Sequence, residues 1–326
     1  MGLKQLPPYY ECGGKETPIK RLGKYTENGN IYLKLESYNL HKSIKSITAY
    51  YIIQDIVKNN KANNIVESTS GNLGISLGYF AKLVGLNFLC LVDSTVPDGK
   101  LKKLEKYGIK YQIVDSTGEI DPRKARIRVA KEIDKKNDWL WTNQYDNMMN
   151  PRGHYEITGP ELYRQMHGDI DYLVCSIGTG GTICGAALYL KEKNPNIKIV
   201  AVEPLGSTIF GGEAKPYLTA GSGLSGLSKI IEKYLCTIDY YSKVDDLYSI
   251  KECIDMEKKE GISVGITTGS VLHVAKILSK KYPGKNIACI SPDSGEPYKE
   301  IINKNKNKVL EGESSIHPIS DIYALI

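Results

Sequence analysis

The sequence is poor in arginine. Only six of its 43 basic residues are Arg, and the remaining 37 are Lys. The lysines are scattered and the net charge of +6 is small for 326 residues, which argues against the concentrated basic patch of a nucleic-acid-binding protein. Phenylalanine is also rare, with three Phe beside 23 Tyr, an imbalance typical of a compositionally biased genome. Half of the scarce arginine nevertheless falls within one short segment, at Arg123, Arg126 and Arg128.

Long hydrophobic runs are missing as well. No apolar stretch approaches the roughly 18 residues of a membrane-spanning helix, and the first residues lack the apolar core of a secretory signal peptide. We therefore expect a cytoplasmic protein with no membrane segment. The seven cysteines are widely spaced and form no CxxC pair, so we expect buried free thiols rather than a disulfide or a metal site.

What the sequence does contain is an alternation of short β-branched runs with helical patterns. Apolar residues recur at helical spacing in residues 44–56 and 268–278. Seven segments are predicted to be strands: 31–36, 63–69, 87–93, 110–115, 171–177, 198–204 and 286–292. This alternation predicts an α/β fold with largely parallel sheets.

The length predicts more than one lobe, because 326 residues exceed a typical domain of about 150. A long insertion with its own βαβ units follows the first predicted strand. We therefore expect a large cofactor-binding lobe made of residues 1–40 and 151–326, and a smaller, mobile lobe made of residues 41–150.

A glycine-rich loop follows the predicted strand at 171–177 and opens a helix. Its glycines let the backbone approach a ligand, and N–H groups at a helix N-terminus bind anions. Gly178 and Gly180 fit the first two glycines of a dinucleotide-binding loop, and Glu203 stands where a ribose-binding acid would. Ile183 replaces the third glycine, and two threonine hydroxyls favour a compact terminal phosphate. A purely structural glycine turn is the other alternative.

Three further segments place polar groups where α/β folds bind ligands. Residues 68–74, STSGNLG, form either a carboxylate site or a simple helix cap. Residues 292–296 follow the last predicted strand and form either a ligand-binding end or an ordinary turn. Two lysines lie near a predicted helix start, where the helix dipole disfavours the charged form, as an imine-forming lysine requires. Lys45 leans toward the apolar stripe of that helix, whereas Lys42 is expected to be solvated.

Taken in this order, the segments resemble those of fold-type II pyridoxal-phosphate enzymes of the cysteine synthase family, over roughly residues 12–300. The resemblance begins at residues 14–22, GKETPIKRL, similar to the family's G-N-T-P-L-x-x-L. Each motif is weak alone, whereas six in the same order are specific. The resemblance implies a tryptophan synthase β-like fold, with two lobes that each hold a mostly parallel twisted sheet flanked by helices. It also implies pyridoxal 5′-phosphate as cofactor and a homodimer.

The resemblance implies a role for each matching residue. Lys45 holds the cofactor as a Schiff base, Asn72 bonds its 3′-oxygen, and Ser294 meets its pyridine nitrogen. The cofactor phosphate is held by Gly178, Thr179, Gly180, Gly181 and Thr182. The amino-acid substrate is bound by Thr69, Ser70, Gly71 and Gln144.

The loop before the lysine departs from the family pattern. The family's N-P-x-G-S-x-K-D-R here reads N-L-H-K-S-I-K-S-I, so the Pro, Gly, Asp and Arg are lost. His41 and Lys42 are either substrate contacts of this enzyme or surface residues, and we favour the second. Leu73 and residues 143–155 resemble the siderophore-type branch, which includes N-(2-amino-2-carboxyethyl)-L-glutamate synthase. That branch implies condensation of O-phosphoserine with glutamate toward 2,3-diaminopropionate.

The residues fit a β-replacement on an activated L-serine, O-phosphoserine or O-acetylserine, through an aminoacrylate. Lys45, once freed, takes the Cα proton. A neutral Ser294 cannot keep the pyridine nitrogen fully protonated, which favours elimination over transamination. Asp293 is expected to point to the opposite face if the strand continues. The alternatives are a cysteine synthase that uses sulfide and, from another class, an NAD-dependent oxidoreductase.

Helical phase within the arginine cluster bears on the nucleophile. With Pro122 as the first helical residue, Arg126 shares an apolar-leaning face with Val129 and Ile133, while Arg128 faces solvent. An inward Arg grips a phosphate or side-chain carboxylate bidentately, which Lys cannot do. The alternative is a structural Arg with a carboxylate partner. We expect Arg126 to bind substrate, and an amino-acid amine such as L-glutamate to be the nucleophile.

Overall fold

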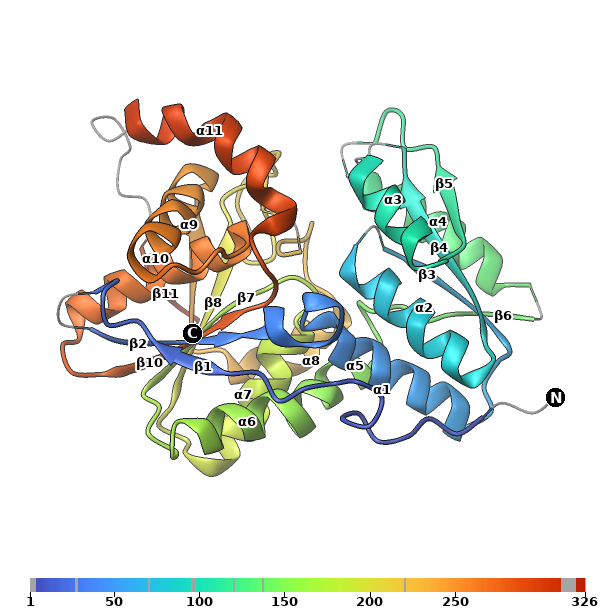
Figure 1. The fold of residues 1–326 in the computed structure, drawn as a ribbon, viewed down its shortest axis with the longest axis horizontal. Helices are drawn as coiled ribbons and strands as arrows, with labels where there is room; N and C mark the ends of the chain where they lie inside the picture. The colour runs from blue at the N-terminus through green and yellow to red at the C-terminus, as the bar shows by residue number, and fades with distance from the viewer. Residues whose placement is uncertain are drawn as a thin grey trace. The chain divides into compact units, whose positions relative to one another are not determined.

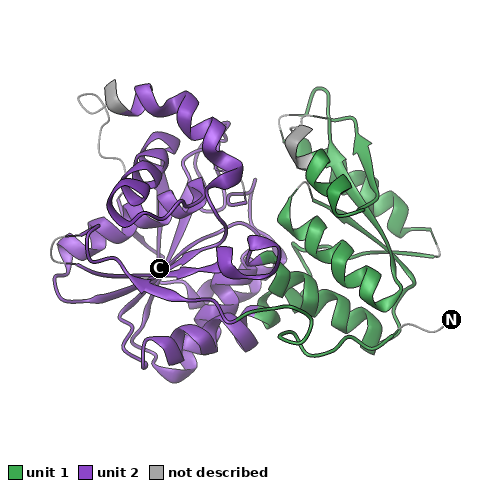
Figure 2. Cartoon of the chain, viewed as in Figure 1, with its two compact units in different colours: residues 1–15, 45–153 green, residues 16–44, 154–326 purple. Residues whose placement is uncertain are grey.

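The computed structural model describes residues 4–26, 29–69, 71–94, 96, 98–119, 121–136, 138–219, 221–311 and 321–325. The chain forms two compact units: residues 1–15 and 45–153 make unit 1, and residues 16–44 and 154–326 make unit 2 (Figure 2). The chain passes between the units after Ile44 and after Gly153, a few residues beyond the expected boundaries. Residues 1–15 belong to the smaller unit rather than to the large lobe.

Unit 1 is built on a four-stranded parallel sheet in the order β5-β4-β3-β6 (Figure 1). Its strands are β3 (Asn64–Ser68), β4 (Asn87–Asp93), β5 (Tyr111–Val114) and β6 (Trp139–Trp141). Its helices are α1 (Lys45–Lys58), α2 (Asn72–Val84), α3 (Asp98–Lys106), α4 (Pro122–Asp134) and α5 (Met149–Gly153). Both faces of this sheet are covered, as expected for parallel strands.

Alternation along β4 divides the core of unit 1 between the two faces of its sheet. Leu91 packs with Ala125 and Ala130 of α4, whereas its neighbours Cys90 and Val92 pack with residues of α2 and of the region around α3. Successive side chains of a strand point to opposite faces, so one short apolar run contributes to both clusters.

Unit 2 contains a seven-stranded sheet in the order β1-β2-β10-β7-β8-β9-β11. Its strands are β1 (Ile19–Arg21), β2 (Asn30–Leu35), β7 (Tyr172–Ser176), β8 (Lys198–Pro204), β9 (Tyr240–Val244), β10 (Asn286–Ser291) and β11 (Tyr323–Ala324). The two edge strands, β1 and β11, are antiparallel to their neighbours, and the five between them are parallel.

Helices cover both faces of the larger sheet. They are α6 (Gly159–Gln165), α7 (Gly181–Lys193), α8 (Lys229–Tyr234), α9 (Asp246–Glu260), α10 (Ile266–Lys281) and α11 (Lys299–Glu311). In Figure 1, α6 and α7 lie on one side of the strands, and α9 and α10 lie on the other. Val271 and Ala275 of α10 share one buried cluster with Leu33 and Val174 of the sheet. The predicted α/β class with largely parallel sheets is confirmed.

The cysteines and the helix lengths bear on two further expectations. All seven cysteines are free thiols; six are buried, and Cys236 is exposed. Within the described parts of the chain, no helix is both long enough and apolar enough to cross a membrane.

Candidate active site

In unit 2, the glycine loop (residues 178–182) leads from β7 into the first turn of α7. Gly180 adopts a left-handed conformation with φ of 87°, which residues with a side chain rarely do. At Gly178 an added Cβ would lie 3.1 Å from the carbonyl oxygen of Gly221, so a larger residue would displace that backbone. Because α7 continues for 13 residues, the loop stands at the positive end of a full helix dipole, which suits a phosphate group.

Two side-chain contacts hold the glycine loop in place. Ser228 Oγ donates to the carbonyl oxygen of Thr179 at 2.8 Å. The Oγ1 of Thr182 lies 3.3 Å from Nε2 of His154, whose Nδ1 lies 2.9 Å from Oγ1 of Thr158. The histidine ring is fully buried and therefore links the loop to the turn that contains it.

His154 opens a single π-helical turn, His154–Thr158, between α5 and α6. Such turns are rare and often occur at functional sites. No spacing in the sequence marked this histidine as functional, because its hydroxyl partner in the glycine loop lies 28 residues away in the chain. The π-helical turn is the signal that identifies it, and only the structure shows that turn.

The backbone that precedes the candidate cofactor lysine is joined to the segment that follows β10. The N–H of Ile44 donates to the carbonyl oxygen of Pro292 at 2.9 Å, and Ser43 pairs with Asp293 as an isolated antiparallel bridge. Lys45 is the next residue in the chain. The segment that ends at Ile44 and the segment that leads to Ser294 are therefore connected through backbone pairing within unit 2, and Lys45 is the first residue of unit 1 after it.

Ser294 and Asp293 are not separated by strand alternation, because β10 ends at Ser291. The condition for the expected alternation, a strand that continues through both residues, is therefore not met. Ser294 instead pairs with Val264 as an isolated bridge. The carboxylate of Asp293 accepts a hydrogen bond from the Tyr298 hydroxyl at 2.9 Å, which fixes one of its oxygens.

The turn before Ser43 has an unusual backbone. His41 and Lys42 have φ values of 56° and 57°, in the left-handed region that favours glycine. Each such residue costs of order 1–3 kcal/mol. Asn39 spans the entry to this turn: its Oδ1 accepts from the N–H of Leu40 at 2.8 Å, and its Nδ2 donates to Glu36 at 3.0 Å.

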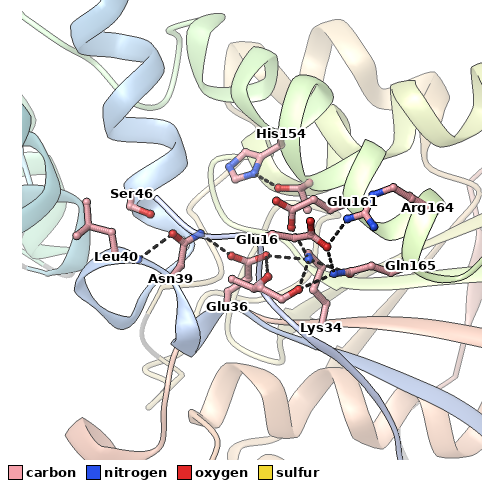
Figure 3. Close-up of polar contacts among 12 residues, drawn as sticks. Glu16, Lys34, Glu36, Asn39, Leu40, Ser46, His154, Glu161, Arg164 and Gln165 are labelled. Carbon is pink, nitrogen blue, oxygen red and sulfur yellow. Dashed lines mark hydrogen bonds and ion pairs between the residues drawn. The ribbon is translucent and has the colours of Figure 1, made fainter. Parts of the chain in front are cut away.

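Glu36 belongs to a buried charge network that anchors this turn (Figure 3). The ammonium of Lys34 lies 2.6 Å from a Glu161 oxygen and 4.0 Å from Glu36, and Thr17 donates to Glu36 at 3.0 Å. Burial raises the pKa of Glu36 above its ordinary value, although the Lys34 ammonium acts in the opposite direction. Two carboxyls and one ammonium thus share a site with little exposure to water.

In unit 1, the carboxyl ends of the parallel strands bring most of the predicted substrate residues to one edge of the small sheet. Thr69 follows β3 and is buried, Gly71 is the N-cap of α2, and Asn72 is its first residue. Ser70 lies outside the described residues. Lys45 is the first residue of α1 and is half-buried. Lys103 Nζ donates to Oδ1 of Asn72 at 3.4 Å.

Gln144 lies at the same edge, after β6. Its Nε2 donates to the carbonyl oxygen of Ser68 at 3.2 Å, and its backbone carbonyl oxygen accepts from Asn150 Nδ2 at 2.9 Å. The side chain is 7% exposed. The structure therefore brings Gln144 directly against the strand end that leads to Thr69.

Glu67 is a buried carboxylate that organises this edge, and the sequence reasoning missed it. It accepts hydrogen bonds from the backbone of Ser68 and Gln144 and from the side chains of Thr142 and Trp141, at 2.6 to 3.4 Å. Burial raises its pKa to about 7, and these donors oppose the shift. Its only signal in the sequence is an acid directly after the apolar pair Ile65-Val66 of a strand.

Arg126 is buried at the same edge, as helical phase predicted, while Arg128 is exposed and paired with Glu119 at 3.0 Å. The Nε of Arg126 lies 3.4 Å from Asp93. Among the described residues, nothing accepts a hydrogen bond from its Nε or Nη1. Burial raises the pKa of the Tyr145 hydroxyl, and the nearby Arg126 partly opposes this shift.

The carboxylate of Glu203, the candidate ribose-binding acid, is bonded to nearby groups of unit 2. It is fully buried, accepts hydrogen bonds from the Ser207 hydroxyl and the N–H of Ile209, and pairs with Lys243 at 2.6 Å. A carboxylate so engaged has no remaining role for a nucleotide ribose.

The predicted residues thus gather at the carboxyl edges of two sheets. In unit 2, the glycine loop and the segment with Ser294 follow β7 and β10, which are adjacent parallel strands. In unit 1, Thr69, Gly71, Gln144 and Arg126 lie at the carboxyl edge of the small sheet. Carboxyl ends of parallel strands are where α/β proteins bind ligands.

Comparison with known proteins points to one chemistry. The sequence model of the family described as "Pyridoxal-phosphate dependent enzyme" matches residues 11–293. A cysteine synthase from Entamoeba histolytica is 27% identical, covers 96% of this chain and 97% of its own, and has a TM-score of 0.84. An O-acetylserine dependent cystathionine beta-synthase from Helicobacter pylori is 27% identical, covers 91% and 98%, and has a TM-score of 0.82. A hydrogen sulfide-producing enzyme from Fusobacterium nucleatum is 30% identical, covers 90% and 99%, and has a TM-score of 0.81.

Proposed function

Because the chain belongs to the pyridoxal-phosphate dependent enzyme family, we propose that it replaces the β-substituent of an activated L-serine with an amino-acid amine such as L-glutamate. The family and its cysteine synthase-like relatives make this a pyridoxal-phosphate enzyme of the β-substituted alanine synthase type. The NAD-dependent alternative is therefore wrong, in agreement with the engaged carboxylate of Glu203.

The residues present fit the cofactor. The glycine loop requires glycine at Gly178 and Gly180 for steric and conformational reasons, and backbone at a helix N-terminus is suited to a phosphate. We propose that this loop, with Thr179 and Thr182, holds the phosphate. Lys45 would hold the cofactor as a Schiff base, Asn72 would bond its 3′-oxygen, and Ser294 would contact its ring nitrogen. These three assignments rest on motif resemblance.

When bound, pyridoxal phosphate withdraws electrons from the Cα of the attached amino acid, so that a β-substituent can leave. Lys45 takes the Cα proton on its amine, which requires the neutral form that a helix N-terminus favours. Gly71 and the N-terminus of α2 bind the α-carboxylate together with Thr69 and Ser70. Gln144 orients the amino acid against the end of β3.

The observation that carries the choice of nucleophile is the buried guanidinium of Arg126. It is 5% exposed, and its Nη1 has no acceptor among the described residues. The guanidinium has one carboxylate partner, Asp93, 3.4 Å from Nε, but a buried donor atom without an acceptor is costly, and a guanidinium can bind a further carboxylate or phosphate with parallel hydrogen bonds. L-Glutamate carries a second anion, its side-chain carboxylate, and supplies that acceptor. Sulfide does not.

Steady-state kinetics of Arg126→Gln, with Arg128→Gln as the matched control, test this proposal. The same helix carries both arginines, but Arg128 is exposed. For Arg126→Gln we expect the ratio of kcat/KM for L-glutamate to that for L-glutamine to fall about 10- to 100-fold, the value of one or two charged hydrogen bonds. The ratio should not change in Arg128→Gln. An equal ratio in wild type and Arg126→Gln would defeat the proposal.

A second candidate function is cysteine synthesis from sulfide, and the names of the relatives favour it. Two of the similar structures are a cysteine synthase and a hydrogen sulfide-producing enzyme. Competition between sulfide and L-glutamate, with O-phosphoserine and O-acetylserine as alternative donors, separates the two functions. Formation of cysteine alone would favour the second candidate.

Several finer expectations belong to the same proposal. We propose a place in siderophore or 2,3-diaminopropionate biosynthesis, on the resemblance of Leu73 and residues 143–155 to that branch. The family resemblance implies a homodimer and a mobile smaller lobe, whereas the expected cytoplasmic location and the large cofactor-binding lobe rest on the sequence pattern. Product analysis by mass spectrometry and sedimentation velocity test the first two.

A further inference from the structure

His41 and Lys42 form the one consecutive left-handed pair of non-glycine residues in the described parts of the chain. The other residues of this kind, Asn60, Asn143 and His167, stand singly. Asparagine tolerates this region because its short side chain bonds locally, whereas lysine gains no such benefit. Glycine at both positions would remove the strain, so the side chains of the His41–Lys42 pair are retained at a cost to stability.

Contacts on both sides hold the pair in its strained conformation. Before it, Asn39 bonds both Leu40 and Glu36, and Glu36 is anchored in the buried network of Lys34 (Figure 3). After it, Ser43 pairs with Asp293. Strained residues persist where the surrounding structure over-determines them, and they concentrate at ligand-binding sites.

The position of the pair in the chain places it beside the reactive lysine. Lys42 precedes Lys45 by three residues, so their Cα atoms are at most about 11 Å apart. Ser43, the next residue after the pair, is bridged to Asp293, the neighbour of Ser294. Lys42 is exposed and His41 is half-buried, so the Lys42 ammonium can reach a soluble ligand, and the His41 ring is its neighbour in the chain.

We propose that the His41–Lys42 pair is a specificity element that binds the terminal anion of an amino-acid substrate, a carboxylate or a phosphate at the end away from the α-amino group. This inference rests on the proposed β-replacement and deepens it. It assigns the backbone strain to substrate selection, and it reverses the expectation that both residues are merely surface residues.

The test compares wild type with His41→Gly/Lys42→Gly and with His41→Asn/Lys42→Asn. The second variant keeps side chains that tolerate the left-handed region and guards against a folding defect in the first. Two ratios of kcat/KM are measured: O-phosphoserine to O-acetylserine with sulfide as nucleophile, and L-glutamate to L-glutamine as nucleophile. The first ratio measures recognition of a phosphate group, and the second measures recognition of a side-chain carboxylate.

We expect at least one ratio to fall about tenfold in both variants, while the melting temperature of the glycine variant stays equal to or above that of wild type. His167→Gly is the matched control, because it removes an exposed histidine at φ of 52° elsewhere in unit 2 and should leave both ratios unchanged. Thermal shifts of the protein by O-phosphoserine and by O-acetylserine give a readout that does not depend on turnover.

A change of less than threefold in both ratios, in both variants, would overturn the inference. Failure of the proposed function looks different. A wild-type enzyme that uses sulfide but not L-glutamate defeats the choice of nucleophile, while the ratio of the two serine donors still reports on the His41–Lys42 pair.

Discussion

The glycine loop of unit 2 and the polar edge of unit 1 differ in how fully their polar groups are satisfied. Around the loop, Ser228 and His154 complete the contacts of Thr179 and Thr182. At the small-sheet edge, buried atoms of three residues lack a hydrogen-bond partner within the described chain: Ser68 Oγ, Arg126 Nε and Nη1, and Asn143 Oδ1.

This difference indicates two ways of building a binding site. A loop that binds through backbone N–H groups, and is itself held by neighbouring side chains, is rigid and suits a permanently bound group. An edge whose side chains keep unused hydrogen-bonding capacity suits a molecule that arrives and leaves, because buried polar groups are normally paired. Substitutions in each of the two regions test this difference.

Lys45→Ala should have the largest effect. Loss of the proposed cofactor lysine and proton acceptor should lower turnover by at least about 10²–10⁴-fold, and the visible absorbance of the lysine-bound cofactor should disappear. Absorbance spectra and turnover measure both effects. Lys58→Ala, at the exposed far end of the same helix, is the control. An unchanged spectrum in Lys45→Ala would refute the assignment.

Gly178→Ala should weaken the cofactor site without touching the small sheet. Its Cβ would lie 3.1 Å from the Gly221 carbonyl, and crowding of this kind costs about 1–3 kcal/mol. We expect roughly tenfold weaker binding of pyridoxal phosphate, measured by equilibrium titration of the apoenzyme. Gly23→Ala is the control, since a Cβ there meets nothing within 4 Å. Equal affinity in the two variants would contradict a tightly packed loop.

Glu67→Gln should have a smaller effect that depends on pH. The folded pKa of about 7 lies above the ordinary value of 4.5, so Glu67 contributes stability below pH 4.5 that is lost as the pH rises through 7. The stability of wild type relative to Glu67→Gln should therefore fall by roughly 2–3 kcal/mol between pH 5 and pH 8. Urea unfolding at several pH values measures this change. If the stabilities of wild type and Glu67→Gln change with pH in the same way, Glu67 makes no such contribution. Glu132→Gln, on the exposed face of α4, is the control.

The fold was largely predictable because its central strands are continuous apolar runs. All seven predicted strands are present, and two of them, β4 and β8, have the predicted limits. Four strands were not predicted: β1, β6, β9 and β11. Three of these have only two or three residues, too few to show a period, and β9 is a tyrosine-rich strand next to an edge. Their formation depends on partners distant in the chain.

The site was predictable where a motif is local and not where it is assembled in space. The glycine loop and the helix start at Lys45 lie within short segments, and the residue types in each segment are enough to predict the kind of group that it could bind. His154 and Glu67 act on residues 28 and 77 positions away. Nothing local distinguishes a buried histidine that supports a hydroxyl from one that only fills the core.

The strand order of the large sheet also determines when each unit can fold during synthesis. All strands of the small sheet lie between Asn64 and Trp141, so this sheet can form before the second half of the chain exists. By contrast, β2 pairs in register with β10, Asn30 opposite Asn286. The early strand must wait for almost the whole chain to emerge from the ribosome before it finds its parallel partner. Such long-range pairing is slow, and β2, which until then can pair only with β1, keeps one exposed edge during that time.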